Sequence, residues 1–269
     1  MNGFDWAAFA RNLAPAAGAA LLVMAVTFAV ALRTGLHRIV DVAWGIGFTA
    51  VALVSYVMSA GDGDPGRRLL VTLLTAVWGL RLALHIARRG RGHGEDPRYE
   101  ALLAKAPGNR DLYALRMVYV LQGALVWLVS LPVQAAQYGA RSLSGFAVAG
   151  AALWAVGLFF EAVGDHQLAR FKSDPAHRGR VMDQGLWSLT RHPNYFGDFC
   201  VWWGIFLVAC DAGAVAAAVA VVSPLTMSYL LVKGSGKPLL ERHMAERPGY
   251  AAYAARTSGF FPRPPKRVP

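Results

Sequence analysis

Charged residues are scarce in this sequence. Asp, Glu, Lys and Arg make up 16% of its 269 residues, whereas soluble domains usually carry about 25%. Hydrophobic residues make up 55%, and many lie in blocks of about twenty, long enough to span a bilayer core of about 30 Å. This pattern excludes a soluble globular enzyme. The high apolar content and the few low-complexity tracts also exclude a disordered chain.

Cysteine and the common cofactor motifs are also largely missing. Cys200 and Cys210 lie in one apolar block, where a helix would separate them by about 15 Å along its axis, too far for a disulfide. The sequence lacks GxxxxGK[ST], and no GxGxxG follows a strand, so neither familiar soluble nucleotide-binding fold is expected. HExxH and GxSxG at a strand-to-helix turn are absent, and the scattered histidines predict no metal site. Three of them, His37, His177 and His243, are expected to be solvated.

Seven apolar segments are each predicted to form a membrane-spanning helix. They cover residues 15–33, 39–59, 68–87, 114–136, 143–164, 195–210 and 212–232. The expected fold is all-α: a single integral membrane domain, residues 1–269, with seven transmembrane helices and ordered cytoplasmic loops. Residues 15–136 hold the first four spans on the substrate side. Residues 143–265 hold the last three spans and the tail on the cofactor side.

The distribution of Lys and Arg predicts the topology. Of the 27 Lys and Arg, 21 lie in the connections 33–38, 88–112 and 165–194 or in the tail from residue 233, and four lie on the opposite side. The positive-inside rule then places the N-terminus outside and the C-terminus in the cytoplasm. Topology thus accounts for most of the formal charge of +11, and no nucleic-acid partner is expected.

Two of the cytoplasmic connections, 88–112 and 165–194, are longer than joining two helices requires. They combine Arg, His and Asp with Trp, Tyr, Phe and Leu, a composition that favours order over disorder. Together with the tail they are predicted to form a basic cap suited to an anionic, phosphate-bearing ligand.

Charged and polar residues at membrane depth are candidate site residues because burying them in lipid is costly. Asp41 opens the second span, either as an interfacial carboxylate held by Arg38 or as a functional group. Arg81 and His85 lie one helical turn apart in the third span and share a face. Arg81 alone would be compatible with snorkelling, but His85 at this depth favours a function.

Similar spacings recur in the second half of the chain. Asn194, Asp198 and Trp202 form one stripe of the sixth predicted helix, which should face protein or a cavity. Lys233, Lys237 and Glu241 repeat the four-residue spacing after the seventh span, where the two lysines are either interfacial anchors or phosphate contacts.

Four stretches together resemble a known family. The segment GLWSLTRHPNYFGDFCVWWG (185–204) and the ending PGYAAYAARTSGFFPRPP (248–265) resemble the C-terminal domain of the steroid 5α-reductase family. The segments GEDPRY (94–99) and IVDVAWGIGF (39–48) are similar to its bacterial DUF1295 branch of membrane proteins. The resemblance covers nearly the whole chain and is sharpest from about 161 to 265.

The resemblance implies an NADPH-dependent reductase acting on a carbon–carbon double bond of a lipid or steroid-like substrate in the bilayer, with no obligate protein partner. Asp165, Arg180, Asn194 and Trp202 match family positions that cradle NADPH, and Arg88 matches an Arg one turn after the family's catalytic Tyr. Further cofactor-binding positions hold other residue types than the family's. Lys172 replaces an Arg of the family, and Asp198 replaces a Glu. Where the steroid enzymes carry an Arg, a His and a Tyr in that order, this chain has Lys233, Lys237 and Glu241.

The N-terminal half departs from the steroid enzymes at the catalytic positions. Asp41 and His85 stand near the places where the steroid enzymes carry a Glu on the second span and a Tyr on the third. We expect both to be catalytic, by stabilising the oxygen of a conjugated carbonyl or donating a proton. Trp44 and Arg81 are expected to bind the substrate.

Two rival functions remain open at this point. The RHPxYxG signature also occurs in membrane methyltransferases of the isoprenylcysteine and phospholipid type, which use S-adenosylmethionine. A transporter or lipid-binding scaffold without chemistry is the other rival, and the lack of an internal repeat counts against it.

Overall fold

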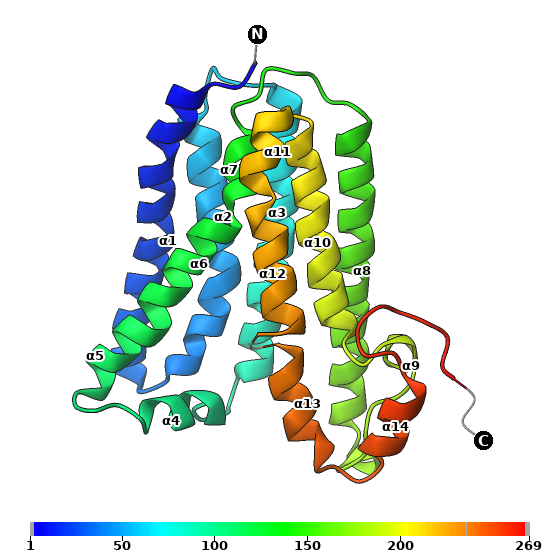
Figure 1. Ribbon diagram of the computed structural model, residues 1–269. Coiled ribbons are helices and arrows are strands. Elements are labelled where there is room, and N and C mark those ends of the chain that lie inside the picture. Colours follow the sequence, from blue (N-terminus) through cyan, green and yellow to red (C-terminus); the bar gives the residue numbers. More distant parts are fainter. Residues whose placement is uncertain (1–2, 235, 267–269) are drawn as a thin grey trace. The chain divides into compact units, whose positions relative to one another are not determined.

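The computed structural model describes residues 3–234 and 236–266, and these residues are almost entirely helical (Figure 1). They contain no β-strand, only isolated bridges between Phe4 and Gly139 and between Thr190 and Ser258. The prediction of an all-α protein is therefore confirmed.

Among the described residues, six helices are long and apolar enough to cross a membrane. They are Trp6–Thr34, His37–Met58, Pro65–Gly90, Arg110–Ala136, Gly145–Ser173 and Ala214–Ala245. A helix, α10 (Pro193–Cys210), also forms where the sixth span was predicted, but it is not among these six. The chain is thus a multi-pass, helical membrane protein, and the predicted count of seven spans is approximate.

The chain divides into two compact units. Unit 1 comprises Met1–Val148 and Ile205–Ser223, and unit 2 comprises Ala149–Gly204 and Pro224–Pro269. The helices of unit 1 are α1 (Trp6–Thr34), η1 (His37–Ile39), α2 (Val40–Met58), α3 (Pro65–Gly90), α4 (Pro97–Leu103), α5 (Arg110–Ala114), η2 (Leu115–Val120), α6 (Leu121–Val129), α7 (Leu131–Ala136) and α11 (Ala214–Ala220).

In unit 1, capping residues determine where α1 and α3 begin, and glycines determine how closely α2 and α3 pack. The Asp5 carboxylate accepts a hydrogen bond from the Ala8 N–H and begins α1, and Asp64 begins α3 in the same way through the N–H of Arg67. Helices α2 and α3 cross so closely at Gly45 that a Cβ atom there would lie 2.1 Å from the Gly79 carbonyl oxygen. Glycine is therefore required at this crossing.

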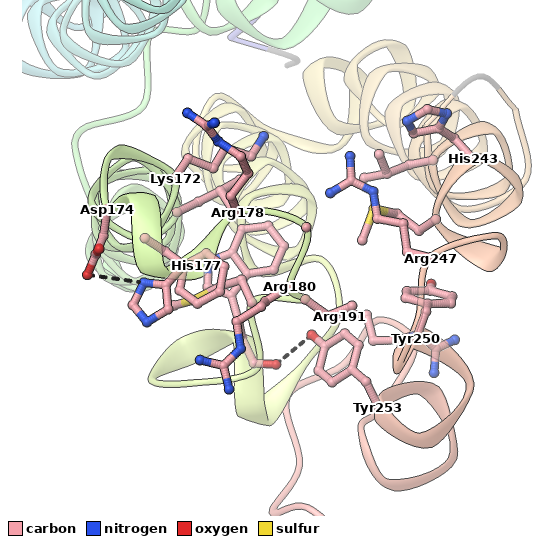
Figure 2. A pocket seen from close by; sticks show the side chains of 18 of the residues that line it. Lys172, Asp174, His177, Arg178, Arg180, Arg191, His243, Arg247, Tyr250 and Tyr253 are labelled. Atoms are coloured by element: carbon pink, nitrogen blue, oxygen red, sulfur yellow. Dashed lines mark hydrogen bonds and ion pairs between the residues drawn. The ribbon is translucent and has the colours of Figure 1, made fainter.

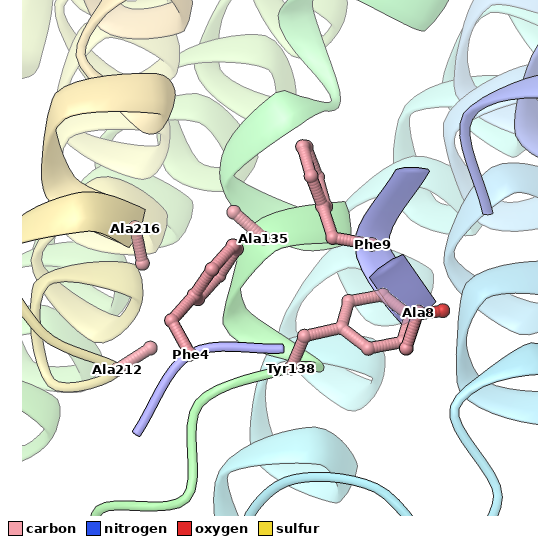
Figure 3. Close-up of a cluster of buried hydrophobic side chains, with 7 residues drawn as sticks. All are labelled: Phe4, Ala8, Phe9, Ala135, Tyr138, Ala212 and Ala216. Carbon is pink, nitrogen blue, oxygen red and sulfur yellow. The ribbon is translucent and has the colours of Figure 1, made fainter. Parts of the chain in front are cut away.

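An apolar cluster fixes the start of the chain in unit 1 (Figure 3). It consists of Phe4, Ala8, Phe9, Ala135, Tyr138, Ala212 and Ala216. Nearby, the fully buried Arg67 donates hydrogen bonds to the main-chain carbonyl groups of Ala136, Gly139 and Arg141. Since a buried guanidinium needs such acceptors, this side chain ties the residues after α7 to the first turn of α3.

Unit 2 carries the second set of helices. They are most of α8 (Gly145–Ser173), η3 (Pro175–His177), α9 (Leu186–Leu189), most of α10, most of α12 (Val222–Val232), α13 (Lys237–Ala245) and α14 (Tyr250–Arg256). A Cβ atom at Gly197 of α10 would lie 2.5 Å from the Gly157 carbonyl oxygen of α8, and one at Gly204 would lie 2.6 Å from that of Gly150. Glycines seven residues apart on each helix thus form a close, antiparallel α8–α10 seam.

Candidate functional site

Unit 2 contains a cavity of about 520 Å³, within the usual size range of small-molecule sites (Figure 2). It is lined by the end of α8, the connection that follows, and residues of α13 and α14. Its basic lining residues are Lys172, Arg178, Arg180, Arg191 and Arg247. Asp174 is the one carboxylate among the lining residues, and its oxygen lies 3.6 Å from Nδ1 of His177. The lining therefore carries an excess of positive charge.

Aromatic rings form the other part of the lining. The rings of Phe171 and His177 stack with their centroids 4.2 Å apart and their planes 6° from parallel. The hydroxyl of Tyr253 donates a hydrogen bond of 2.6 Å to the carbonyl oxygen of Trp187. Burial raises the pKa of the Tyr253 hydroxyl above its ordinary value, so this group stays a neutral donor. The cavity thus offers cations for an anion and flat apolar surfaces for a ring.

Two contacts anchor the start of α9 to α8. The indole N–H of Trp187 donates to the Gly164 carbonyl oxygen at 3.0 Å, and the Leu186 N–H donates to the Gln167 side-chain oxygen at 3.0 Å. Gly185 has a φ of 58°, a conformation that residues with a side chain rarely adopt. The glycine of the sequence GLW therefore permits the turn that brings Trp187 into the cavity wall.

The RHPN segment anchors the C-terminal helices. Arg191 donates to Glu241 on α13 and to the carbonyl groups of Ala254 and Thr257, which lie at and just after the end of α14. The Thr190 hydroxyl donates to the Phe260 carbonyl oxygen at 2.7 Å. This side of the cavity is consequently assembled from segments that are far apart in the sequence.

Two of the nine cofactor residues predicted in unit 2, Lys172 and Arg180, line this cavity. Glu241 accepts hydrogen bonds from Arg191 and pairs with His192 at 3.2 Å. Lys233 follows α12 and is exposed, whereas Lys237 begins α13 and is half-buried. The cavity therefore gathers part of the predicted set.

The other four predicted residues lie on the two long helices of unit 2. Asp165 is buried on α8, and Trp202 is completely buried on α10. Asn194 and Asp198 are half-buried on the same helix, and the Asn194 side-chain oxygen accepts from the Tyr195 N–H at 3.1 Å. None of these four residues lines the 520 Å³ cavity.

In unit 1, Asp41 is held by the segment GEDPRY. The Tyr99 hydroxyl donates to one oxygen of the Asp41 carboxylate at 2.5 Å, and Nη2 of Arg98 donates to the other at 2.9 Å. Arg38, the partner considered from the sequence, donates to the carbonyl oxygen of Gly94 at 2.8 Å. Burial, and next the charge of Asp41, raise the pKa of Tyr99, so the phenol remains protonated beside a carboxylate.

The remaining candidates of unit 1 lie on α2 and α3. Arg81 and His85 are half-buried on α3, and Arg88 is exposed in its last turn. The Trp44 ring on α2 packs edge-on against Phe48, with centroids 5.4 Å apart. The two predicted catalytic residues thus lie on two helices that pack against each other in unit 1.

One histidine does not follow the expectation from the sequence. His37 is only 6% exposed, its Nδ1 lies 3.1 Å from the Tyr119 hydroxyl, and its main-chain N–H donates to Glu95. The expectation that His37 is solvated was wrong, because the segment at residue 95 folds back over η1. In the part of the chain that the structure describes, no group of three His, Cys, Asp or Glu residues could hold a metal ion.

Several residues of the unit 2 cavity and of the surroundings of Asp41 were not predicted from the sequence. Arg178, Arg191 and Arg247 complete the basic lining of the cavity, and Arg98 and Tyr99 hold Asp41. The repeated arginines of HRGR (177–180) were a signal for Arg178. Nothing in the local spacing pairs Tyr99 with Asp41, since 58 residues separate them.

Comparisons with known proteins give one result. No curated protein and no solved structure matches the chain. A family model, described as "Protein of unknown function (DUF1295)", matches residues 27–257. This match covers most of the chain and most of each unit. The chain therefore belongs to the DUF1295 family.

Proposed function

We propose that this protein is an NADPH-dependent reductase that reduces a carbon–carbon double bond, conjugated to a carbonyl, in a lipid within the membrane. The observation that carries the proposal is the basic, aromatic-lined cavity of unit 2, which includes Lys172 and Arg180. The resemblance of the RHPN segment and the C-terminal tail to the steroid 5α-reductase family supports the same activity.

The charge of the cavity favours NADPH over S-adenosylmethionine. Five Lys and Arg and one carboxylate line it. NADPH carries a pyrophosphate and a 2′-phosphate, which guanidinium groups bind well through paired hydrogen bonds. S-adenosylmethionine has no phosphate and bears a positive sulfonium, so this lining would repel its reacting end. The methyltransferase is therefore the weaker alternative.

The residues present fit the cofactor chemically. Lys172 and Arg180, with Arg178 and Arg247, would hold its phosphates, and the stacked rings of Phe171 and His177 offer a face to a flat base. When bound, NADPH supplies the hydride that reduces the double bond.

In unit 1, the groups around Asp41 would handle the carbonyl oxygen and the proton. Asp41 as a carboxylate accepts hydrogen bonds only, so its role would be to orient the Tyr99 hydroxyl, 2.5 Å away. When the substrate is bound, the one proton of the phenol would turn from Asp41 to the carbonyl oxygen, and the phenol and His85 would then stabilise negative charge on that oxygen as it develops. A protein donor or water would supply the proton to the α-carbon. Trp44 and Arg81 would contact the substrate, which would enter laterally from the bilayer.

The topology of the proposal follows from the charge distribution. With 21 of the 27 Lys and Arg on one side of the spans, the N-terminus would lie outside and the C-terminus in the cytoplasm. NADPH would then bind from the cytoplasm, where it is made.

Titration of the purified full-length protein with NADPH, NADH and S-adenosylmethionine tests the proposal. We expect tight binding of NADPH alone, weakening as salt rises. Arg180→Gln should reduce NADPH affinity about tenfold, the loss of one charge-assisted contact. Arg170→Gln, an exposed residue of α8 that does not line the cavity, should leave it within about twofold. Binding of S-adenosylmethionine without NADPH would contradict the proposal.

A further inference from the structure

Unit 1 has a cavity of its own, of about 230 Å³, where α2 begins and α3 ends. Its lining includes an apolar set of residues, the apolar wall, among them Leu36, Ile39, Val42 and Ile86. It also includes a set of ionisable groups, the rim, namely Arg38, Asp41, Arg89, Arg91, His93 and Asp96. A cavity lined by both kinds of group suits an amphiphilic ligand.

The cavity lies at the level expected for lipid headgroups. Helix α3 is apolar enough to span a membrane over Pro65–Gly90, and its last turn contains Arg88 and Arg89, with Arg91 directly after it. Basic residues at the end of an apolar span lie at the membrane–water interface, where phosphate groups of lipids are concentrated. A lipid headgroup at this level would therefore lie at the height of the cavity.

The cations of the rim differ in how far they are already engaged. Arg38 donates to the Gly94 carbonyl oxygen at 2.8 Å and so holds the connection between α3 and α4 in place. Arg89 and Arg91 are exposed at the rim, and among the described residues no ion pair is recorded for either. Guanidinium groups bind phosphate with two parallel hydrogen bonds. These two side chains are thus the available phosphate contacts.

The carboxylates of the rim select against a ligand that is only anionic. Arg98 donates to Asp41 at 2.9 Å and to both oxygens of Asp96 at 3.0 Å. One guanidinium therefore donates to both carboxylates. Asp96 accepts three hydrogen bonds from Arg98, counting its main-chain N–H, which leaves about one of its roughly four lone-pair positions. An ammonium group would donate a further hydrogen bond to the Asp96 carboxylate, whereas an anionic group placed beside that carboxylate would be repelled by it.

We propose that this cavity binds the phosphoethanolamine headgroup of an aminophospholipid. Arg89 and Arg91 bind its phosphodiester, and its ammonium lies against Asp96. The lipid's glycerol end packs on the apolar wall at Ile39 and Ile86. The cavity shares Asp41 with the proposed reductase chemistry, but the headgroup contacts of Arg89, Arg91 and Asp96 do not depend on that chemistry.

Native mass spectrometry of the full-length protein, titrated with single lipids in detergent, tests the proposal. Dioleoylphosphatidylethanolamine should bind at least about tenfold more tightly than dioleoylglycerol, which lacks the phosphate, and about threefold more tightly than dioleoylphosphatidylglycerol, which lacks the ammonium. The double variant R89Q/R91Q should lose about tenfold in affinity for the phosphatidylethanolamine. Arg33→Gln, at an exposed arginine at the end of α1 that does not line the cavity, should change it less than twofold.

Asp96→Asn separates the two contacts, because asparagine keeps the side-chain oxygen that accepts the Arg98 N–H at the start of α4. It should abolish the preference over phosphatidylglycerol and leave the preference over dioleoylglycerol. Unchanged melting temperatures verify that the variants fold, whether or not NADPH binds. Equal binding of dioleoylglycerol, or no effect of R89Q/R91Q, would overturn the proposal. Full competition by soluble glycerophosphoethanolamine would overturn the assignment to a membrane lipid.

Discussion

Arg191 donates two hydrogen bonds to one carboxylate oxygen of Glu241, from Nε at 2.9 Å and from Nη2 at 2.7 Å. The side chains of this pair are 15% and 25% exposed. Because Arg191 also donates to the Ala254 and Thr257 carbonyl groups, one side chain connects the start of α10 with both C-terminal helices. The pair thereby holds one wall of the unit 2 cavity in place.

Removing the charge of Glu241 should loosen that wall. In Glu241→Gln the Arg191 guanidinium still faces a side chain of the same shape, but it loses its counter-ion. The free energy of unfolding should fall by about 1–3 kcal/mol. We expect a lower melting temperature in detergent and weaker NADPH binding. Glu246→Gln, at an exposed position just after α13, is the matched control and should alter neither. A Glu241→Gln protein with unchanged stability and affinity would show that the pair does not support the cavity.

The buried His192 should make stability depend on pH. Burial lowers the pKa of His192 to about 4, and the hydrogen bond with Glu241 opposes this shift. The unfolded chain binds this proton near pH 6.5, so between pH 6.5 and 4 only the unfolded state is protonated. Stability should therefore fall as pH drops through this window, by at most about 1.4 kcal/mol per pH unit, and His192 should contribute no slope above it.

Melting temperatures across that window measure the effect. His192→Phe should flatten the dependence, because phenylalanine binds no proton in either state. His243→Phe, at an exposed position, should leave the dependence intact. An identical pH profile for wild type and His192→Phe would mean that other groups cause it.

The close approach of α8 and α10 should not tolerate a methyl group. Gly197→Ala would place a Cβ atom 2.5 Å from the Gly157 carbonyl oxygen, and the helices would have to separate, at a cost of about 1–3 kcal/mol. At Gly145 nothing lies within 4 Å of such an atom, so Gly145→Ala should be neutral or slightly stabilising. We expect a drop in melting temperature for the first variant alone. Equal effects of the two would argue against a tight seam.

The helices could be predicted from the sequence because their cause is local. An apolar block of about twenty residues in a bilayer satisfies its backbone only as a helix, so α1, α2, α3 and α8 lie where the hydropathy places them. Membership of the DUF1295 family was equally visible in the short segments IVDVAWGIGF and GEDPRY. The α10 helix was found too, although its polar residues keep it outside the six apolar spans.

The contacts of the site could not be predicted in the same way, because they join distant segments. Arg191 meets Glu241 across 50 positions, and Asp41 meets Tyr99 across 58. Periodicity within one helix carries no information about such pairs. It placed Glu241 on a helical stripe with Lys237, but not against Arg191. The solvated reading of His37 failed for the same reason, since its partners Glu95 and Tyr119 belong to other segments.

The groups proposed to act on the substrate should affect turnover more than cofactor binding. Asp41→Asn, His85→Phe and Tyr99→Phe should each lower kcat and kcat/KM together, by about 10²–10⁴-fold, because they act when charge develops on oxygen. NADPH affinity should stay within about threefold, less than the tenfold that 1.4 kcal/mol represents. Single-turnover oxidation of NADPH, paired with a cofactor titration, measures both. Normal turnover in all three variants would remove these residues from the reaction.

The transfer of hydrogen from NADPH to a membrane lipid tests the central claim most directly. Protein in native membranes is incubated with NADPH deuterated at both hydrogens of nicotinamide carbon 4, and the extracted lipids are analysed by mass spectrometry. We predict that a lipid acquires deuterium and loses one double bond, that Asp41→Asn slows this by about 10²–10⁴-fold, and that Arg180→Gln slows it when NADPH is below saturation. Absence of deuterium in every lipid, together with uptake of a labelled methyl group from S-adenosylmethionine, would contradict the account and identify a methyltransferase.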